Sequence, residues 1–252
     1  MNRSLVYGGD KFNIRTPAPL HCPGCHHPLA NKAICDAIEA LGLVGEVVAV
    51  WGVGCAAMGM ATVNLDSIST AHGRALDVAT GIKRALRGKP LVFAVMGDGD
   101  CVAIGAEALF NAAARGEKVT GIMINNANYG TTGGQMAPTT LLGQVTATTP
   151  EGRSAESTGF PVHVPEMLVP WKGVTYAARG SVHTPANFQR TKGYLEKAFK
   201  KQMDGVGFTF VEVVSACPSD WHMTPVDCLK FIEEKMLAEY PLGEFKDVDT
   251  IV

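Results

Sequence analysis

The chain of 252 residues lacks an excess of charge of either sign, because 22 lysines and arginines stand against 24 aspartates and glutamates. A protein whose main partner is DNA or RNA usually carries a basic surface, so we expect no nucleic-acid partner. Charged residues make up only 18% of the chain and hydrophobic residues 46%. This balance excludes general disorder, and a chain of this length can bury a large core.

The sequence also lacks an apolar run typical of a membrane span. Its longest apolar stretch, residues 44–63, is interrupted by Glu46 and four glycines, which suits a buried strand and turn better than a bilayer helix. The first residues contain neither the apolar segment nor the cleavage site of a secretory leader. We therefore expect a cytoplasmic protein without membrane contact, whose seven cysteines are reduced.

Strand-like and helix-like segments alternate along the chain. Short apolar runs predict buried strands, and alanine-rich or amphipathic stretches predict helices. The expected strands are 47–51, 91–96, 119–125 and 208–214, and the expected helices are 75–87, 103–115, 185–203 and 225–240. This alternation is typical of the α/β class, with a doubly wound, mainly parallel sheet and helices on both faces.

No internal repeat or low-complexity tract divides the chain. We expect a single domain over residues 1–252. Within it we distinguish an N-terminal segment, 1–30, and a C-terminal helix and tail, 225–252, where the charge rises.

Two of the expected strands end in unusual turns. One runs into Gly97, Asp98, Gly99 and Asp100, and the other ends in Asn125-Asn126. Parallel strands joined by a right-handed crossover would bring the turns together at one sheet edge, where glycines let the backbone approach a phosphate. A lone Gly-Asp-Gly is more often an ordinary turn. Together with the Asn-Asn turn, its carboxylate favours a Mg²⁺ and diphosphate site.

Four of the cysteines lie in turns or loops. Cys22 and Cys25 form a Cys-x-x-Cys pair, Cys55 follows Gly54, and Cys217 lies far downstream. Four thiolates from loops can surround one iron–sulfur cluster. The pair alone is equally compatible with half of a zinc site or a redox pair, although the chain has no second Cys-x-x-Cys.

The other three cysteines are interpreted as packing residues. Cys35 and Cys228 lie in helical patterns, and free cysteine behaves as a small buried hydrophobe. Cys101 follows the Asp98 turn so closely that a local role beside the diphosphate stays open.

The glycine-rich and asparagine-rich turns resemble a known motif. Gly97-Asp98-Gly99 followed by Asn125-Asn126 is similar to the thiamine diphosphate motif. The next segment, YGTTGGQ from Tyr129, narrows the resemblance to the β subunit of 2-oxoacid:ferredoxin oxidoreductases, with further matches at 72–75, 133–140 and 240–243. The resemblance covers nearly the whole chain and is strongest to the branched-chain type, 2-oxoisovalerate:ferredoxin oxidoreductase.

This resemblance implies thiamine diphosphate, Mg²⁺ and one [4Fe-4S] cluster. The implied Mg²⁺ ligands are Asp98, Asn126 and the carbonyl of Asn128. The implied cofactor-binding residues are Gly54, Cys55, Gly97, Asp98, Gly99, Asp100, Asn126, Asn128, Tyr129, Gly130 and Thr131. The implied cluster ligands are Cys22, Cys25, Cys55 and Cys217.

The resemblance also gives roles to histidines near these motifs. It places His72 and Arg74 beside the thiazolium and substrate as catalytic residues, where the residues alone favour a simple polar turn before a helix. His21, His26 and His27 flank the Cys-x-x-Cys pair. We interpret them as residues of the outer layer or an interface, able to donate hydrogen bonds toward cluster sulfurs.

The implied reaction is the coenzyme A-dependent oxidative decarboxylation of a 2-oxoacid to acyl-CoA and CO₂, with electrons passed to ferredoxin. A separate α subunit would supply the glutamate that activates the cofactor. Further γ and ferredoxin-like δ subunits are expected, since this chain lacks the compact cysteine run of bacterial ferredoxins. This chain alone should therefore be inactive.

The substrate prediction depends on one loop. Residues 132–135 read Thr-Gly-Gly-Gln, where 2-oxoglutarate-type subunits read Thr-Lys-Gly-Gln, so the cation that could face a dicarboxylate is missing. This favours a neutral 2-oxoacid such as 2-oxoisovalerate, with 2-oxoglutarate and pyruvate as alternatives. Gly133 is also compatible with an ordinary turn glycine, with specificity set elsewhere.

Two functions of other classes stay open from the residues. A non-oxidative thiamine diphosphate-dependent decarboxylase or synthase would explain Asp98 and Asn126 but not the four cysteines in loops. A zinc-stabilised binding module would explain Cys22 and Cys25 but neither glycine-rich turn.

Overall fold

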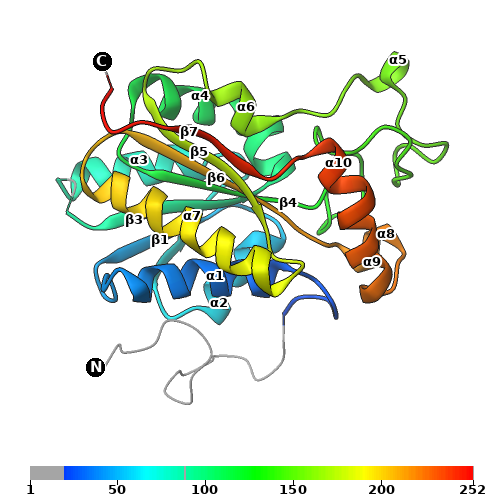
Figure 1. Cartoon of the computed structure of the whole chain (residues 1–252), viewed down its shortest axis with the longest axis horizontal. Coiled ribbons are helices and arrows are strands. Elements are labelled where there is room, and N and C mark those ends of the chain that lie inside the picture. Colours follow the sequence, from blue (N-terminus) through cyan, green and yellow to red (C-terminus); the bar gives the residue numbers. More distant parts are fainter. Residues whose placement is uncertain (1–19, 88, 252) are drawn as a thin grey trace.

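A computed structural model describes residues 20–87 and 89–251, and its centre is a seven-stranded sheet (Figure 1). The strand order is β2-β1-β3-β4-β6-β5-β7. The first six strands in this order are parallel, and β7 runs antiparallel to β5 at one edge. The strands are β1 (Val47–Trp51), β2 (Asp66–Ser69), β3 (Leu91–Gly97), β4 (Thr120–Asn125), β5 (Val174–Ser181), β6 (Phe208–Val214) and β7 (Gly243–Asp247).

Helices cover both faces of this sheet. On one face α1 (His27–Ala40) and α7 (Pro185–Met203) lie side by side and bury apolar side chains against the strands (Figure 1). On the other face α3 (Ala75–Ala85), α4 (Ala106–Arg115) and α6 (Val164–Leu168) enclose a second apolar core. The α/β class and the doubly wound, mainly parallel sheet predicted from the sequence are confirmed.

Short helices complete the chain between and after the strands. They are η1 (Cys55–Met58), α2 (Gly59–Thr62), η2 (Asp100–Ile104), α5 (Ala155–Thr158), α8 (Pro218–Trp221), α9 (Pro225–Phe231), η3 (Ile232–Met236) and α10 (Leu237–Glu239). A third small core, which includes Trp221 and Tyr240, packs the C-terminal helices against the loop after β4. None of the helices in the described ranges is both long and apolar enough to cross a membrane.

The predicted strands are all present, and α7 and β6 have the predicted bounds. Two predicted helices are interrupted. The helix expected over 103–115 is preceded by the π-helical turn η2, and the one expected over 225–240 is divided by the π-helical turn η3. Such turns are often found at functional sites, and η2 begins at Asp100, two residues after Asp98.

Three strands were not predicted. β5 contains a charged residue, Arg179, while β2 and β7 lie at sheet edges and are mostly polar or exposed, so none shows a buried apolar run. The single-domain interpretation and its two terminal segments stay predictions; residues 1–19 of the N-terminal segment and residue 252 lie outside the described residues.

The register of the strands brings the predicted turns together. Gly97 at the end of β3 pairs with Ile124, and Asn125 at the end of β4 pairs with Val214 of β6. The loops that follow β3, β4 and β6 therefore leave the same edge of the sheet, where parallel α/β sheets bind their ligands.

Candidate functional site

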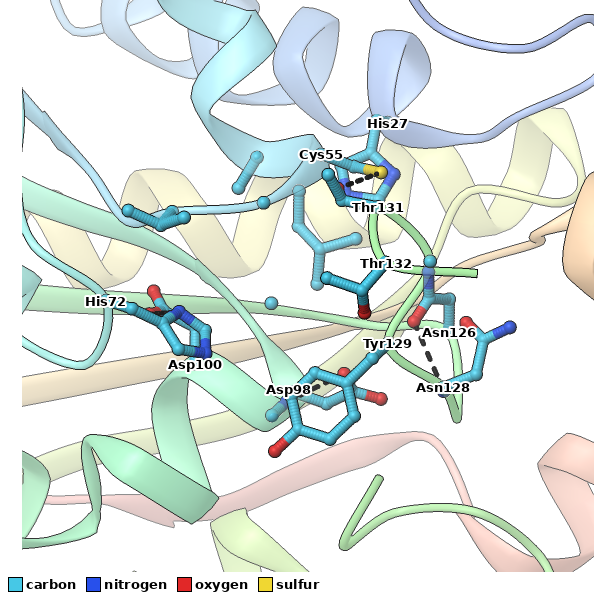
Figure 2. A pocket seen from close by; sticks show the side chains of 17 residues that line it. His27, Cys55, His72, Asp98, Asp100, Asn126, Asn128, Tyr129, Thr131 and Thr132 are labelled. Atoms are coloured by element: carbon cyan, nitrogen blue, oxygen red, sulfur yellow. Dashed lines mark hydrogen bonds and ion pairs between the residues drawn. The ribbon is translucent and has the colours of Figure 1, made fainter. Parts of the chain in front are cut away.

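The ends of β3 and β4 border a cavity of about 220 Å³, which we call the cofactor cavity (Figure 2). All eleven residues predicted to bind cofactor line it, from Gly54 to Thr131, and His72 lines it as well. Its lining also includes residues without a predicted binding role: His27, Val53, Ala56, Ile124 and Thr132. Apart from His27, these side chains are apolar or hydroxylic neighbours of predicted residues and carry no distinctive signal of their own.

Asp98 presents a buried carboxylate to the cavity. Its Oδ1 accepts a hydrogen bond from the Gly99 N–H at 2.8 Å, and its Oδ2 accepts one from the Thr139 hydroxyl at 2.5 Å. Burial raises the pKa of Asp98 from 3.8 to about 7, although both hydrogen bonds oppose the rise. A divalent cation bound to this carboxylate would favour its charged form, so Asp98 is suited to be a metal ligand.

The turn after β4 supplies amide oxygens on the other side of the cavity (Figure 2). Asn126 Oδ1 accepts a hydrogen bond from the Asn128 N–H at 3.4 Å, and the Asn126 carbonyl accepts one from the Trp221 indole at 3.0 Å. The side-chain oxygen of Asn128 is buried without a hydrogen-bond partner. A buried polar atom of this kind requires a partner, and oxygen ligands beside a carboxylate suit Mg²⁺. These oxygens therefore fit the predicted metal, although the unpartnered oxygen of Asn128 belongs to its side chain and the predicted ligand was its backbone carbonyl.

The glycine after Asp98 is required by a close contact. A Cβ atom at Gly99 would lie 2.0 Å from the ring of Tyr129. Tyr129 covers the Asp98 turn inside the cavity (Figure 2). The Gly-Asp-Gly motif thus serves the packing of the two turns, and its role in access for a phosphate stays a prediction.

His72 and Asp100 form the opposite wall (Figure 2). His72 Nδ1 lies 2.6 Å from Asp100 Oδ1, and this oxygen also accepts the Gly73 N–H at 2.6 Å. Burial raises the pKa of Asp100, and the Gly73 N–H and His72 oppose this rise. The carboxylate orients the imidazole at the cavity edge. Sequence reasoning assigned Asp100 to the cofactor but missed this pairing with a residue 28 positions away.

Arg74 is not among the residues that line the cofactor cavity. Its guanidinium pairs with Glu107 and, at 3.1 Å, with Asp77, and it donates to the Ile104 carbonyl at 2.9 Å. These contacts hold the loop before α3 against the start of α4. Its catalytic role stays a prediction.

The four cysteines predicted as cluster ligands line a second cavity of about 150 Å³, which we call the cysteine cavity. Cys55 also lines the cofactor cavity, as do His27, Asn126 and Gly130, so the two cavities share a wall. Cys55 Sγ lies 3.0 Å from the Thr131 hydroxyl, and Cys25 Sγ lies 3.3 Å from His27 Nδ1.

The environment of the thiols favours their neutral form in the absence of a metal. Burial raises the pKa of Cys25 to about 11 and also raises that of Cys217. Iron bound to the sulfur would favour the thiolate. Within residues 20–87 and 89–251, no group of three or more His, Cys, Asp and Glu side chains is spaced to hold a single metal ion. A [4Fe-4S] cluster takes four cysteine thiolates, and the lining of one cavity by four cysteines fits that requirement.

The remaining cysteines are fully buried, as predicted for Cys35, Cys101 and Cys228. The histidines beside the Cys-x-x-Cys pair are buried too. His21 Nε2 lies 3.1 Å from the Cys55 carbonyl, and its ring stacks on that of His27. Burial lowers the pKa of His26 to about 4 and that of His27 to about 3, so both rings are neutral at pH 7.

Several known proteins are similar to this chain in sequence or in fold. Residues 46–213 match the family model "Thiamine pyrophosphate enzyme, C-terminal TPP binding domain". Ketoisovalerate oxidoreductase subunit VorA of Methanothermobacter marburgensis is 39% identical over 227 residues, covering 90% of this chain and 47% of its own length. 2-Oxoglutarate synthase subunit KorB of Methanocaldococcus jannaschii is 34% identical over 250 residues, covering 91% of this chain and 88% of its own length.

A solved structure is similar over nearly the whole chain. It is the 2-oxoglutarate:ferredoxin oxidoreductase from Magnetococcus marinus with 2-oxoglutarate, coenzyme A and succinyl-CoA bound, with a TM-score of 0.76 and 25% identity. The match covers 97% of this chain and 88% of that one. In contrast, this chain spans about half the length of the VorA proteins that it matches.

Proposed function

The chain belongs to the β-type subunits of the 2-oxoacid:ferredoxin oxidoreductases, and from this membership we propose that it forms the thiamine diphosphate half of such an enzyme. The reaction would be the oxidative decarboxylation of a 2-oxoacid to acyl-CoA. One observation carries the proposal: a cavity lined by Asp98, Asn126 and Asn128 shares a wall with a cavity lined by four cysteines.

The proposed reaction balances in atoms and electrons. A 2-oxoacid and coenzyme A give acyl-CoA, CO₂, one proton and two electrons, and two oxidised ferredoxins accept the electrons one at a time. Thiamine diphosphate supplies the electron sink that allows the bond between the carboxylate and the 2-oxo carbon to break. No oxidant besides ferredoxin is needed.

The protein's own residues bind and orient in this proposal. Asp98, Asn126 and Asn128 hold Mg²⁺ and through it the diphosphate, while the glycines beside Asp98 let the backbone approach phosphate oxygens. Asp100 fixes the ring of His72 at the cavity edge through the 2.6 Å contact. His72 is therefore placed to hold or move a proton near the substrate.

The electron path would cross the shared wall. Cys22, Cys25, Cys55 and Cys217 would hold one [4Fe-4S] cluster, with Cys55 reaching from the cofactor cavity into the cysteine cavity. These four residues would hold the cluster beside the cofactor cavity, where a bound cluster would supply one-electron chemistry. The buried, neutral His27 lies beside Cys25 Sγ, and the Thr131 hydroxyl lies beside Cys55 Sγ. Both contacts would influence the reduction potential of the cluster.

We propose a neutral branched-chain 2-oxoacid, such as 2-oxoisovalerate, as the substrate. No lysine or arginine is among the described residues that line the cofactor cavity, so nothing in that lining neutralises a second carboxylate. Gly133, which stands where 2-oxoglutarate-type subunits have lysine, has a φ of +106° and lies outside the cavity lining. The identity to the ketoisovalerate subunits, 38–39%, is slightly higher than the 31–36% identity to the KorB subunits, and it points the same way.

The partners of the proposed enzyme follow from what this chain does not supply. We propose an α subunit that contributes the activating glutamate, together with γ and ferredoxin-like δ subunits and soluble ferredoxin. Coenzyme A and the 2-oxoacid would enter where the subunits meet.

The proposal is tested with the complex purified under anaerobic conditions. Beyond the iron of the ferredoxin-like subunit, we expect about four iron and four acid-labile sulfide per copy of this chain. We also expect bound thiamine diphosphate, and viologen reduction that requires both coenzyme A and a 2-oxoacid. A panel of 2-oxoisovalerate, pyruvate and 2-oxoglutarate identifies the substrate. Stoichiometric zinc in place of these four additional irons would refute the cluster, and turnover without an electron acceptor would favour a non-oxidative thiamine enzyme.

A further inference from the structure

A buried ion pair lies beneath the turn that follows β4. Arg179 of β5 and Glu212 of β6 are neighbours across the two strands, and both side chains are fully buried. Arg179 Nε donates to Glu212 Oε2 at 2.9 Å, and the two terminal nitrogens of Arg179 bind the carboxylate of Glu166 at 2.7 Å each. Burying such charges costs desolvation energy that their attraction often fails to offset. The pair therefore calls for a role besides stability.

The second oxygen of Glu212 connects the pair to the turn. Glu212 Oε1 accepts a hydrogen bond from Asn125 Nδ2 at 2.7 Å. Asn125 Oδ1 in turn accepts one from the Ala127 N–H at 3.0 Å. Every polar atom of the fully buried Asn125 side chain is thus fixed between the ion pair and the backbone of the turn.

The backbone at Ala127 requires this support. Its φ of +55° lies in the left-handed region, which costs a residue with a Cβ atom roughly 1–2 kcal/mol. The Ala127 carbonyl accepts the Thr140 hydroxyl at 2.6 Å, and the Asn126 carbonyl accepts the Trp221 indole at 3.0 Å. A strained residue held from several sides is common at functional sites. Here it lies between Asn126 and Asn128, the two asparagines that line the cofactor cavity.

We propose that Arg179, Glu212 and Asn125 are positioning residues that hold the 126–128 turn in the conformation that binds the cofactor's metal. None of the three lines the cofactor cavity. Their hydrogen bond to the turn is made at the Ala127 N–H, while the charge of Glu212 also acts on Asp98 directly. The inference rests on the proposed function, since it assumes that the turn binds Mg²⁺ with thiamine diphosphate.

The direct test is Asn125→Ala in the assembled enzyme. Removing the amide takes a hydrogen-bond acceptor away from the Ala127 N–H. We therefore expect Mg²⁺ to bind about tenfold more weakly in calorimetric titrations with saturating thiamine diphosphate, as is typical when a residue that hydrogen-bonds to a metal ligand is removed. Thr209→Val is the matched control. The hydroxyls of Thr120 and Thr209 hydrogen-bond at 2.8 Å between the same two strands, β4 and β6, at the end far from the turn. We expect the control to bind within twofold of the wild type.

The role of the ion pair is tested with Glu212→Gln. This change keeps an oxygen for Asn125 but removes the charge that faces Arg179, and we expect weaker Mg²⁺ binding than in the wild type. Unchanged affinity would overturn the role of the pair.

A rescue experiment tests the role of the strained backbone. Glycine adopts positive φ without the cost that alanine bears, so Ala127→Gly should recover part of the affinity lost in Asn125→Ala. Equal losses in the single and double variants would overturn the argument from strain.

Hydrogen exchange separates this inference from the proposed function. The Ala127 amide should exchange faster in Asn125→Ala than in the wild-type full chain, a measurement that requires no cofactor. Wild-type enzyme that binds no thiamine diphosphate would count against the proposed function. Wild-type binding with an unaltered Asn125→Ala variant, or equal exchange at Ala127, would overturn the inference itself.

Discussion

Replacing Asp98 by asparagine should stabilise the cofactor-free chain while abolishing its response to Mg²⁺ and thiamine diphosphate. Asparagine has the same shape as aspartate. Its oxygen can accept the Gly99 N–H, and its amide group can donate to the Thr139 hydroxyl oxygen, so both contacts of Asp98 are replaced. The change removes only the buried charge.

The magnitude follows from the pKa of the carboxyl group. Burial raises the pKa of Asp98 from 3.8 to about 7, a difference that corresponds to about 4 kcal/mol at 1.36 kcal/mol per unit. Between these pH values the folded chain keeps a proton that the unfolded chain releases, so the free energy of unfolding falls as the pH rises from about 4 to about 7. We expect Asp98→Asn to be close to wild type at pH 4 and more stable by up to this amount at pH 8.

Urea unfolding followed by tryptophan fluorescence measures both effects. At pH 8, Mg²⁺ with thiamine diphosphate should stabilise the wild type by mass action and leave Asp98→Asn unchanged. If Asp98→Asn is less stable than the wild type at pH 8 without cofactors, the claim that the buried Asp98 charge destabilises the folded chain is refuted. Equal stabilisation of both proteins by the cofactors would refute Asp98 as the metal ligand.

Three further changes test the two cavities. Cys217→Ser should lower the iron of the anaerobically purified complex by about four per copy of this chain, with a matching fall in visible absorbance, whereas the buried Cys35→Ser should change neither. Equal iron contents in the two variants would exclude Cys217 as a ligand. Thr131→Val removes the hydroxyl 3.0 Å from Cys55 Sγ and should lower the cluster's reduction potential in an EPR-monitored titration, because hydrogen bonds to sulfur stabilise the reduced cluster. Thr131→Ser keeps the hydroxyl and should have the wild-type potential. Equal potentials in all three proteins would refute the contact. Thr139→Val removes the hydroxyl that binds the metal-site carboxylate and should weaken Mg²⁺ about tenfold in calorimetry, a result that unaltered affinity would contradict.

The sequence predicted most of the central sheet and the residues of the cofactor cavity because both have local signals. Apolar runs mark β1, β3, β4 and β6, and the turns after two of them combine glycine, carboxylate and amide groups. Parallel strands then require these turns to meet at one edge. Asp98 and Asn126 could be found in this way without knowledge of the structure.

Interactions between distant segments had no such signal. Arg179 and Glu212 are typical surface residues by type, yet the pairing of β5 with β6 buries them against each other. Asp100 was predicted as a cofactor residue, but its contact with His72 depends on the loop before α3 folding across the end of β3. Cys217 lies more than 150 residues after Cys55 along the chain, so the sequence could place both in loops, but only the family resemblance assigned them to one cluster.

Cys55 belongs to the walls of both cavities, so in the proposed enzyme the two cofactors would share one side chain. Oxidation of the cluster would release a thiol that also shapes the space for thiamine diphosphate. Loss of the cluster in air should then also change the shape of the space that thiamine diphosphate would occupy.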